Sequence, residues 1–274
     1  MSSRGPSPRK ALGQHFLIDP NIVRKILAAA DVRPDETVLE IGPGLGALTR
    51  PLCEAATRVI AVEIDDRLIA HLHQMLHDCP NLDLRHGDAL NVRWADLPDR
   101  TVLVANLPYY VSSPLLFAAL EGHRHWHRMV LMIQREVAQR LIAAPGTRDY
   151  GILSVLTRYR AEANLAFHVS PNCFRPRPDV GSTVVTFMSR ERPAADVADE
   201  ALFIRVVRAA FAHRRKTLLN SLRDEGFAQG IVAALRETGI DPSRRAETLA
   251  LEEFARLANA VHGLEAHGDR PLAE

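Results

Sequence analysis

The tetrapeptide Asn106-Leu107-Pro108-Tyr109 carries residue types that could act on an aromatic amine such as N6 of adenine. Such an amine is a poor nucleophile, because its lone pair is delocalised into the ring. Two acceptors, the Asn106 side-chain oxygen and the Leu107 carbonyl, could take both amine hydrogens and orient the nitrogen toward a methyl group. Pro108 would stiffen the turn, and the Tyr109 ring could lie against the base. The same residue types also occur in ordinary turns at strand ends.

The tetrapeptide follows the apolar run 102–105, which is typical of a buried strand. From Thr37 onward, short β-rich runs alternate with segments of helical spacing. The expected strands are 37–41, 58–63, 82–85, 101–105 and 129–133, and the expected helices between them include 45–54 and 66–77. This alternation predicts an α/β fold with a mostly parallel, doubly wound, Rossmann-like sheet. Two further runs, 163–169 and 183–188, predict a closing antiparallel hairpin.

The composition changes after the expected hairpin, at 189–193. Beyond that point only helical patterns occur, at 200–211, 216–224, 231–238 and 251–261. We therefore predict a first domain over residues 1–190, with a basic N-terminal arm, and a small helical domain over residues 195–274.

The composition bounds the possible classes of protein. The chain has 274 residues, a net charge of +1, 47% hydrophobic and 24% charged residues, which is ordinary for a globular protein. The cysteines Cys53, Cys79 and Cys173 form no CxxC pair, so neither a disulfide framework nor a zinc module is expected. Without an apolar leader or a membrane span, we expect a cytoplasmic protein that does not bind membranes. Nothing in the pattern demands more than a monomer.

Polar residues at three other expected strand ends indicate a nucleotide-like ligand. Gly42 opens a glycine-rich turn after the first strand, and Glu63 closes the second, where a carboxylate can accept hydrogen bonds from ribose hydroxyls. Asp88 follows the third strand and could accept from an adenine amine, although such an aspartate is often only a cap. A dinucleotide or S-adenosylmethionine fits these residues. Asn106 at the fourth strand end favours S-adenosylmethionine, because a nicotinamide enzyme needs no such tetrapeptide.

Several ordered motifs resemble the small-subunit (16S) ribosomal RNA adenine dimethyltransferase family. They run over most of the chain and comprise Leu12-Gly13-Gln14-His15-Phe16-Leu17, Glu40-Ile41-Gly42-Pro43-Gly44, Glu63, Gly87-Asp88-Ala89, Asn106-Leu107-Pro108-Tyr109-Tyr110, Phe174-Arg175-Pro176-Arg177-Pro178 with Val180 and Ser182, and Arg214-Arg215-Lys216-Thr217. This resemblance implies a class I methyltransferase with S-adenosylmethionine as co-substrate, which dimethylates N6 of two adjacent adenosines near the 3′ end of that RNA in a precursor 30S particle.

The resemblance also implies roles for individual residues. The cofactor site would be lined by His15, Leu17, Gly42, Glu63, Asp88 and Asn106. Tyr109 and Phe174 would flank a flipped adenine, although without the resemblance Phe174 is better interpreted as a core residue. The chain departs from the family at His15, which is often asparagine, and at Asp179 and Gly181, where lysine and aspartate are usual. The resemblance therefore does not fix the contact made by the His15 side chain or the local RNA contacts around Asp179 and Gly181.

Basic residues gather in two places despite the near-neutral total charge. The RNA-binding candidates are Arg9, Lys10, Arg214, Arg215 and Lys216, although such a run is often only a solvated face. The histidine-rich run 123–127 lacks Cys or carboxylate partners at ligand spacing, so we expect no metal site. Two alternatives remain open: a methyltransferase of large-subunit RNA that confers antibiotic resistance, and a non-catalytic factor for small-subunit assembly.

Overall fold

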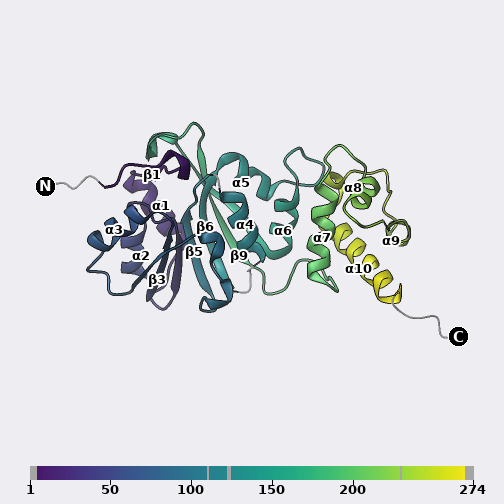
Figure 1. The fold of residues 1–274 in the computed structure, drawn as a ribbon, viewed down its shortest axis with the longest axis horizontal. Coiled ribbons are helices and arrows are strands. Elements are labelled where there is room, and N and C mark those ends of the chain that lie inside the picture. Colours follow the sequence, from purple (N-terminus) through teal and green to yellow (C-terminus); the bar gives the residue numbers. More distant parts are fainter. Residues whose placement is uncertain (1–4, 110, 122–124, 229, 269–274) are drawn as a thin grey trace. The chain divides into compact units, whose positions relative to one another are not determined.

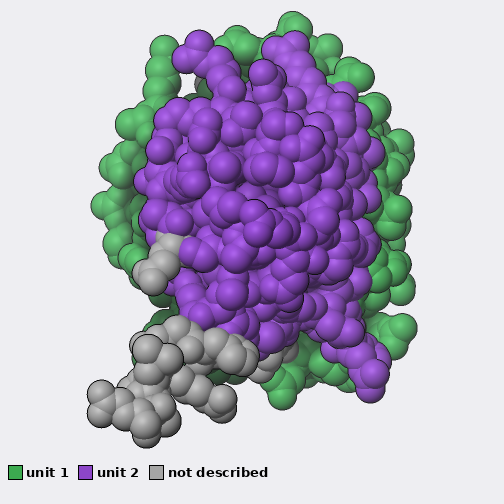
Figure 2. Space-filling view, turned by 90° about the vertical axis from the view of Figure 1, so that its right-hand side faces the viewer, with its two compact units in different colours: residues 1–138, 161–190 green, residues 139–160, 191–274 purple. Residues whose placement is uncertain are grey.

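The structure is a computed structural model that describes residues 5–109, 111–121, 125–228 and 230–268. The chain divides into two compact units, which Figure 2 shows in different colours. Unit 1 comprises residues 1–138 and 161–190, and unit 2 comprises residues 139–160 and 191–274. Each unit is described by itself.

Unit 1 is built on one large sheet (Figure 1). Its strands are β2 (Thr37–Ile41), β3 (Arg58–Glu63), β4 (Leu82–His86), β5 (Thr101–Asn106), β6 (Trp126–Gln134), β7 (Ala161–Val169) and β9 (Ser182–Ser189). Their order across the sheet is β4-β3-β2-β5-β6-β9-β7. Strands β2 to β6 pair in parallel, whereas β9 runs antiparallel to β6 and to β7. The predicted parallel sheet with a closing antiparallel hairpin is confirmed.

Both faces of this sheet are covered, as a doubly wound fold requires. Val38 and Leu39 project to opposite faces of β2, and both are fully buried. The helices of this unit are α1 (Pro20–Ala30), α2 (Thr49–Ala55), α3 (Asp66–Met75), α4 (Ser112–Glu121) and the first part of α5 (Arg135–Ile142). Ile26 of α1 and Leu52 of α2 belong to one core cluster with Val38, so these helices pack on the same face. Helix α2 begins later than predicted, because residues 45–48 continue the glycine-rich turn.

A second, two-stranded sheet was not predicted. It pairs β1 (Phe16–Leu17) with β8 (Phe174–Arg175) in antiparallel register, so that Leu17 lies opposite Phe174. Strands of two residues give no periodicity that could be detected in the sequence. Their pairing fixes the N-terminal segment against the loop that precedes β9.

Unit 2 is helical. It contains the end of α5, α6 (Ile152–Arg160), α7 (Glu200–Phe211), α8 (Leu218–Asp224), α9 (Ile231–Thr238) and α10 (Leu251–Gly268). Aromatic contacts join these helices: the ring of Tyr159 lies 4.6 Å from that of Phe203, and Phe211 lies 5.7 Å from Phe254.

The division differs from the predicted boundary in one segment. Residues 139–160 were expected in the first domain, which was predicted to extend over residues 1–190. In the structure α6 packs through Tyr159 on α7, so this segment belongs to unit 2.

None of the helices in the described ranges is both long and apolar enough to cross a membrane.

Candidate active site

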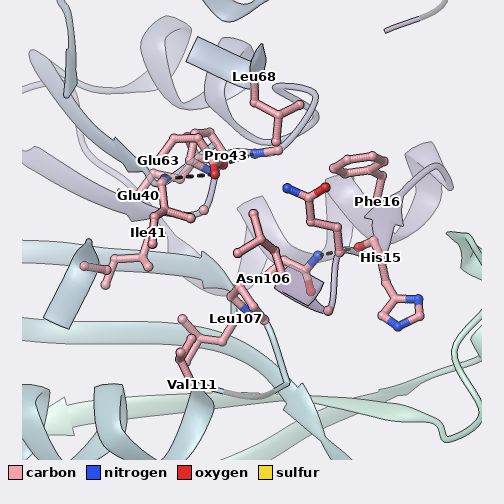
Figure 3. A pocket seen from close by; sticks show the side chains of 18 of the residues that line it. His15, Phe16, Glu40, Ile41, Pro43, Glu63, Leu68, Asn106, Leu107 and Val111 are labelled. Atoms are coloured by element: carbon pink, nitrogen blue, oxygen red, sulfur yellow. Dashed lines mark hydrogen bonds between the residues drawn. The ribbon is translucent and has the colours of Figure 1, made fainter. Parts of the chain in front are cut away.

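The carboxyl ends of the parallel strands open into one pocket of unit 1 (Figure 3). Gly42 follows β2, Glu63 ends β3, Asp88 lies just beyond β4, and Asn106 ends β5. Residues 12–17 also line this pocket. The structure brings together every residue to which the sequence assigns a catalytic or cofactor role: His15, Leu17, Gly42, Glu63, Asp88, Asn106, Leu107, Pro108, Tyr109 and Phe174.

The glycine-rich turn brings backbone, rather than side chains, to the pocket. Gly42 and Gly44 have φ angles of 67° and 60°, in the left-handed region that glycine adopts without strain. A Cβ atom on Gly44 would lie 3.1 Å from Cδ1 of Phe16, which is tighter than most real contacts. Glycine at this position therefore lets β1 pack directly onto the turn.

Glu63 presents a buried carboxylate beside this turn. Its Oε1 accepts hydrogen bonds from the N–H groups of Ile64 and Asp65, both at 3.0 Å, and its Oε2 accepts from the Gly44 N–H at 3.3 Å. Figure 3 shows this carboxylate beside Pro43 of the turn. Burial raises the pKa of this carboxyl. Each carboxylate oxygen can accept two hydrogen bonds, so Oε2 can take one more donor, such as a ribose hydroxyl.

A second buried carboxyl, Glu40, also lines the pocket, although the sequence pattern did not single it out. It is 2% exposed, and its Oε2 has no hydrogen-bond partner in the described chain. Burial raises the pKa of Glu40 to about 8, with a smaller contribution from the charge of Glu63. The carboxyl is therefore mostly protonated at neutral pH, and a cationic ligand in the pocket would favour its ionised form. An acid inside the apolar strand Val38-Leu39-Glu40-Ile41 was the signal that could have identified it.

Asp88 combines two properties. Its Oδ1 accepts from the Leu90 N–H at 2.9 Å and caps the short helix η2 (Ala89–Asn91), as the alternative interpretation supposed. No donor from the described residues takes its other oxygen, and the residue lines the pocket. A capping aspartate can therefore still accept a hydrogen bond from a ligand.

The backbone of His15 fixes the amide of Asn106. Asn106 Nδ2 donates to the His15 carbonyl oxygen at 3.2 Å (Figure 3). This bond assigns the nitrogen, so Oδ1 is left as an acceptor for the pocket. Leu107 donates its N–H to the Met132 carbonyl at 3.1 Å, and no described residue donates to the Leu107 carbonyl. The end of β5 thus offers two neighbouring acceptors.

The two predicted aromatic walls differ in burial. The Tyr109 hydroxyl forms a hydrogen bond with Ser182 Oγ at 2.8 Å, and burial raises the pKa of the phenol. Phe174 is only 3% exposed and belongs to the hydrophobic core with Leu17. Phe174 is therefore a core residue, as the alternative interpretation proposed, that also lines the pocket.

The imidazole of His15 points away from the glycine-rich turn. Its Nδ1 donates to the Pro176 carbonyl oxygen at 2.8 Å, and its ring lies 5.4 Å from that of Tyr109 with 32° between the planes. In Figure 3 the ring is turned away from Glu63 and Pro43. The hydrogen bond between His15 and the strand end at Asn106 is accepted by the His15 backbone carbonyl and does not involve the ring.

Asp65 fastens the N-terminal segment beside the pocket, which the sequence did not reveal. The Asp65 carboxylate accepts from Gln14 Nε2 at 3.0 Å and lies 3.3 Å from the guanidinium of Arg9. Hydrogen bonds from Arg67 hold the pKa of Asp65 well below its usual range. Of the two RNA-binding candidates in this segment, Arg9 is thus ion-paired within the protein, whereas Lys10 is exposed at the start of η1 (Lys10–Leu12).

The three basic candidates of unit 2 follow α7. Arg214 donates to the Arg148 carbonyl at 2.8 Å, and Lys216 forms an ion pair with Asp224. Arg215 is exposed, and no partner for it occurs among the described residues. All three lie on the surface of the unit, but Arg215 has the guanidinium that is most available to a phosphate.

The histidine-rich run starts outside the described residues, which exclude His123 and Arg124. His127 Nδ1 donates to the Arg100 carbonyl at 2.6 Å, and its Nε2 lies 3.1 Å from Glu36 Oε1. Over the described ranges, no group of three or more His, Cys, Asp or Glu side chains could hold a metal ion.

The fold and the pocket together define a class of protein. This sheet order, with a strand-end pocket beside a glycine-rich turn, is that of a class I S-adenosylmethionine-dependent methyltransferase. Comparison with known proteins then gives the family. The model of the ribosomal RNA adenine dimethylase family matches residues 6–262, so the chain belongs to that family. The family predicted from the ordered motifs is confirmed.

Individual relatives agree with this assignment. The chain is 44% identical to the ribosomal RNA small subunit methyltransferase A of Geobacter metallireducens, over 96% of this chain and 99% of the relative. It is 47% identical to the protein of the same name from Moorella thermoacetica, over 94% of each. Among solved structures, a dimethyladenosine transferase from Plasmodium falciparum has 28% identity and a TM-score of 0.74, covering 89% of this chain and 96% of that one. The 23S rRNA methyltransferase ErmE has 28% identity and a TM-score of 0.66, covering 90% and 99%.

Proposed function

We propose that this enzyme transfers two methyl groups from S-adenosylmethionine to N6 of each of two adjacent adenosines near the 3′ end of 16S ribosomal RNA, during ribosome biogenesis. The observation that carries this proposal is the paired acceptor at the end of β5, Asn106 Oδ1 with the Leu107 carbonyl. It lies in the same pocket as Glu63 and Asp88, whose remaining oxygens suit the ribose and the adenine of the cofactor.

The pocket residues suit a cationic cofactor. S-adenosylmethionine supplies a methyl group on a positively charged sulfur when it is bound. Glu40 and Glu63 are two carboxyls whose pKa values are raised by burial. A cation close to them would restore their ionised forms. The glycine-rich turn, where a side chain at Gly44 would meet Phe16, has room for backbone only and lets a ligand approach the turn closely.

The chemistry needs acceptors and alignment more than a strong base. N6 forms its bond to the methyl carbon as the bond from that carbon to sulfur breaks, and S-adenosylhomocysteine leaves. Asn106 Oδ1 and the Leu107 carbonyl hold the two amine hydrogens, which turns the nitrogen lone pair toward the methyl group. The methylated amine is cationic and therefore acidic, so water or Asn106 Oδ1 can accept its proton. In a second transfer the monomethylated amine has one hydrogen left, which one of the two acceptors holds while the nitrogen attacks a second methyl group.

The target base must leave its helix to reach this pocket. Tyr109 is partly exposed and offers one aromatic face, while Phe174 would support the other side from within the core. Lys10 and Arg215 have no ion-pair partner among the described residues and are the most available candidates for phosphate contacts. Unit 2 would thus contribute to RNA binding. The substrate in this proposal is a precursor 30S particle. The enzyme acts as a monomer in the cytoplasm.

A second function deserves an explicit test because of one observation. The structure is similar to that of a 23S rRNA methyltransferase along nearly its whole length, so methylation of large-subunit RNA is the nearest alternative. A non-catalytic role in small-subunit assembly could coexist with either activity.

One experiment separates these functions. Purified protein is incubated with methyl-labelled S-adenosylmethionine and either immature small subunits or large subunits. We expect labelled dimethyladenosine in small-subunit RNA only. Label in large-subunit RNA would favour the alternative, and binding of small subunits without any transfer would favour the assembly role.

A further inference from the structure

The side chain of His15 has chemistry that the proposed reaction does not use. The partner of Nδ1 is the Pro176 carbonyl oxygen, at 2.8 Å, and a carbonyl oxygen can only accept. Nδ1 therefore carries a proton. In the neutral imidazole, Nε2 is then an acceptor. No described residue donates to Nε2, and the ring is only partly buried at the lining of the pocket.

The backbone and the side chain of His15 face different parts of the pocket. Its carbonyl oxygen orients Asn106, which any residue at this position could do. Its ring instead contacts the ring of Tyr109 and the carbonyl of Pro176, directly after β8. Since β8 carries Phe174, the imidazole joins the segments that hold the two aromatic residues proposed to flank the target base.

We propose that His15 is a positioning residue for the target adenosine rather than a side-chain ligand of the cofactor. The imidazole holds the Tyr109 ring and the Pro176 turn in place around the base. Its Nε2 accepts a hydrogen bond from a donor on the target nucleotide. This inference rests on the proposed function, because it deepens the account of the same pocket.

Three substitutions separate the ring from its hydrogen bonds. His15→Phe keeps a ring against Tyr109 but has no donor for the Pro176 carbonyl. His15→Gln keeps a donor and an acceptor but has no ring. His15→Ala removes the ring and its hydrogen-bonding groups. We expect His15→Ala to lower kcat/KM for immature small subunits by about tenfold, with the other two variants between it and the wild type. The dissociation constant for S-adenosylmethionine should change by less than about twofold in all three, because the backbone carbonyl that holds Asn106 is retained.

Two further variants calibrate the measurement. Glu63→Gln should weaken the binding of S-adenosylmethionine and shows that the binding assay detects loss of a cofactor contact. His73→Ala, on the exposed side of α3, should change neither quantity. The inference is overturned if the wild type is active but His15→Ala weakens cofactor binding as much as it lowers kcat/KM, or if His15→Ala leaves kcat/KM unchanged. A wild type that methylates no particle overturns the proposed function, and this inference with it.

Discussion

The pocket has two walls that are built in different ways. The strand-end wall consists of Gly42, Glu63, Asp88 and Asn106, and the register of the parallel sheet sets its geometry: Glu63 pairs with His86, and Asn106 with Met132. The loop wall consists of His15, Tyr109 and Phe174, which come from segments far apart in the sequence. Side-chain contacts and the short pairing of β1 with β8 join the residues of this second wall.

Because the two walls are held in different ways, they suit different ligands. Backbone hydrogen bonds hold the strand-end wall at fixed spacing, which suits a cofactor that all such enzymes share. The loop wall depends on a few side chains, which suits recognition of a particular target. We therefore expect substitutions in the strand-end wall to affect cofactor binding or chemistry, and those in the loop wall to affect the RNA substrate.

The largest effect is expected for Asn106→Ala, at the junction of the two walls. Loss of a preorganised acceptor in the transition state should lower kcat by about a hundred- to a thousandfold. Binding of the immature subunit, measured by co-sedimentation, should stay near the wild-type level. Full activity of this variant in the labelled transfer assay would mean that Asn106 does not orient the amine.

Glu63→Gln tests the strand-end wall by itself. A hydrogen bond to a charged group contributes about 1.5–3 kcal/mol, so the affinity for S-adenosylmethionine should fall by about ten- to a hundredfold. Titration calorimetry with the cofactor measures this loss directly. If the variant bound the cofactor normally but had a raised KM for the RNA particle, Glu63 would act on the RNA substrate. The assignment of the strand-end wall to the cofactor would then be wrong.

Tyr109→Ala tests the loop wall in the same assays. A base stacked on an aromatic ring gains about 1–3 kcal/mol, so kcat/KM for the particle should fall by about five- to a hundredfold. Tyr109→Phe keeps the stacking face and loses the bond to Ser182, and should lie closer to the wild type. Equal losses for the two variants would indicate that the hydroxyl, and not the ring, is what matters.

A charge reversal in unit 2 tests RNA binding by residues that belong to neither wall of the pocket. Arg215→Glu should weaken binding of the particle. Fewer counterions should then be released on binding, by roughly one to two, so the binding constant should fall less steeply as the salt concentration rises. Lys216→Glu is the matched variant, and it should have a smaller effect on binding because Lys216 already pairs with Asp224. Binding isotherms over a range of salt concentrations test both variants. A cofactor affinity that changed in either variant would contradict the proposed role of unit 2.

The last prediction concerns stability rather than activity, and it involves Glu40, the buried carboxyl of β2 that also lines the pocket. Burial raises the pKa of Glu40 to about 8 in the folded protein, from an ordinary value of 4.5. Between these pH values the folded state keeps a proton that the unfolded state has lost. Stability should therefore fall as the pH rises through this window, by at most about 1.4 kcal/mol per pH unit. Glu40→Gln should flatten this slope in thermal unfolding measured at several pH values. An unchanged slope would show that Glu40 is not held neutral.

The same contrast explains what could be predicted from the sequence. The strands ending at Glu63 and Asn106 are apolar runs with polar residues at their ends, so their type and bounds follow from local patterning. The helices α7 and α9 have clear periodicity, and their predicted bounds are those of the structure. Asp199 caps the start of α7, and Gly239 follows the end of α9. These features depend on neighbouring residues alone.

Features that depend on distant contacts could not be predicted in this way. The pairing of β1 with β8 and the contact of α6 with α7 are tertiary, and neither leaves a local pattern. The family motifs place Tyr109 and Phe174 together, but they do not show that Phe174 is buried or that the ring of His15 turns toward Tyr109. The burial of Glu40 likewise depends on the packing around β2.

Nucleoside mass spectrometry of ribosomal RNA from cells with and without this protein tests the central claim most directly. We predict N6,N6-dimethyladenosine at two adjacent positions near the 3′ end of 16S RNA in cells that have the protein, and its absence in cells that lack it. The wild-type chain should restore the modification, and Asn106→Ala should not. Unchanged 16S RNA in the deletion strain, or a loss confined to large-subunit RNA, would contradict the account.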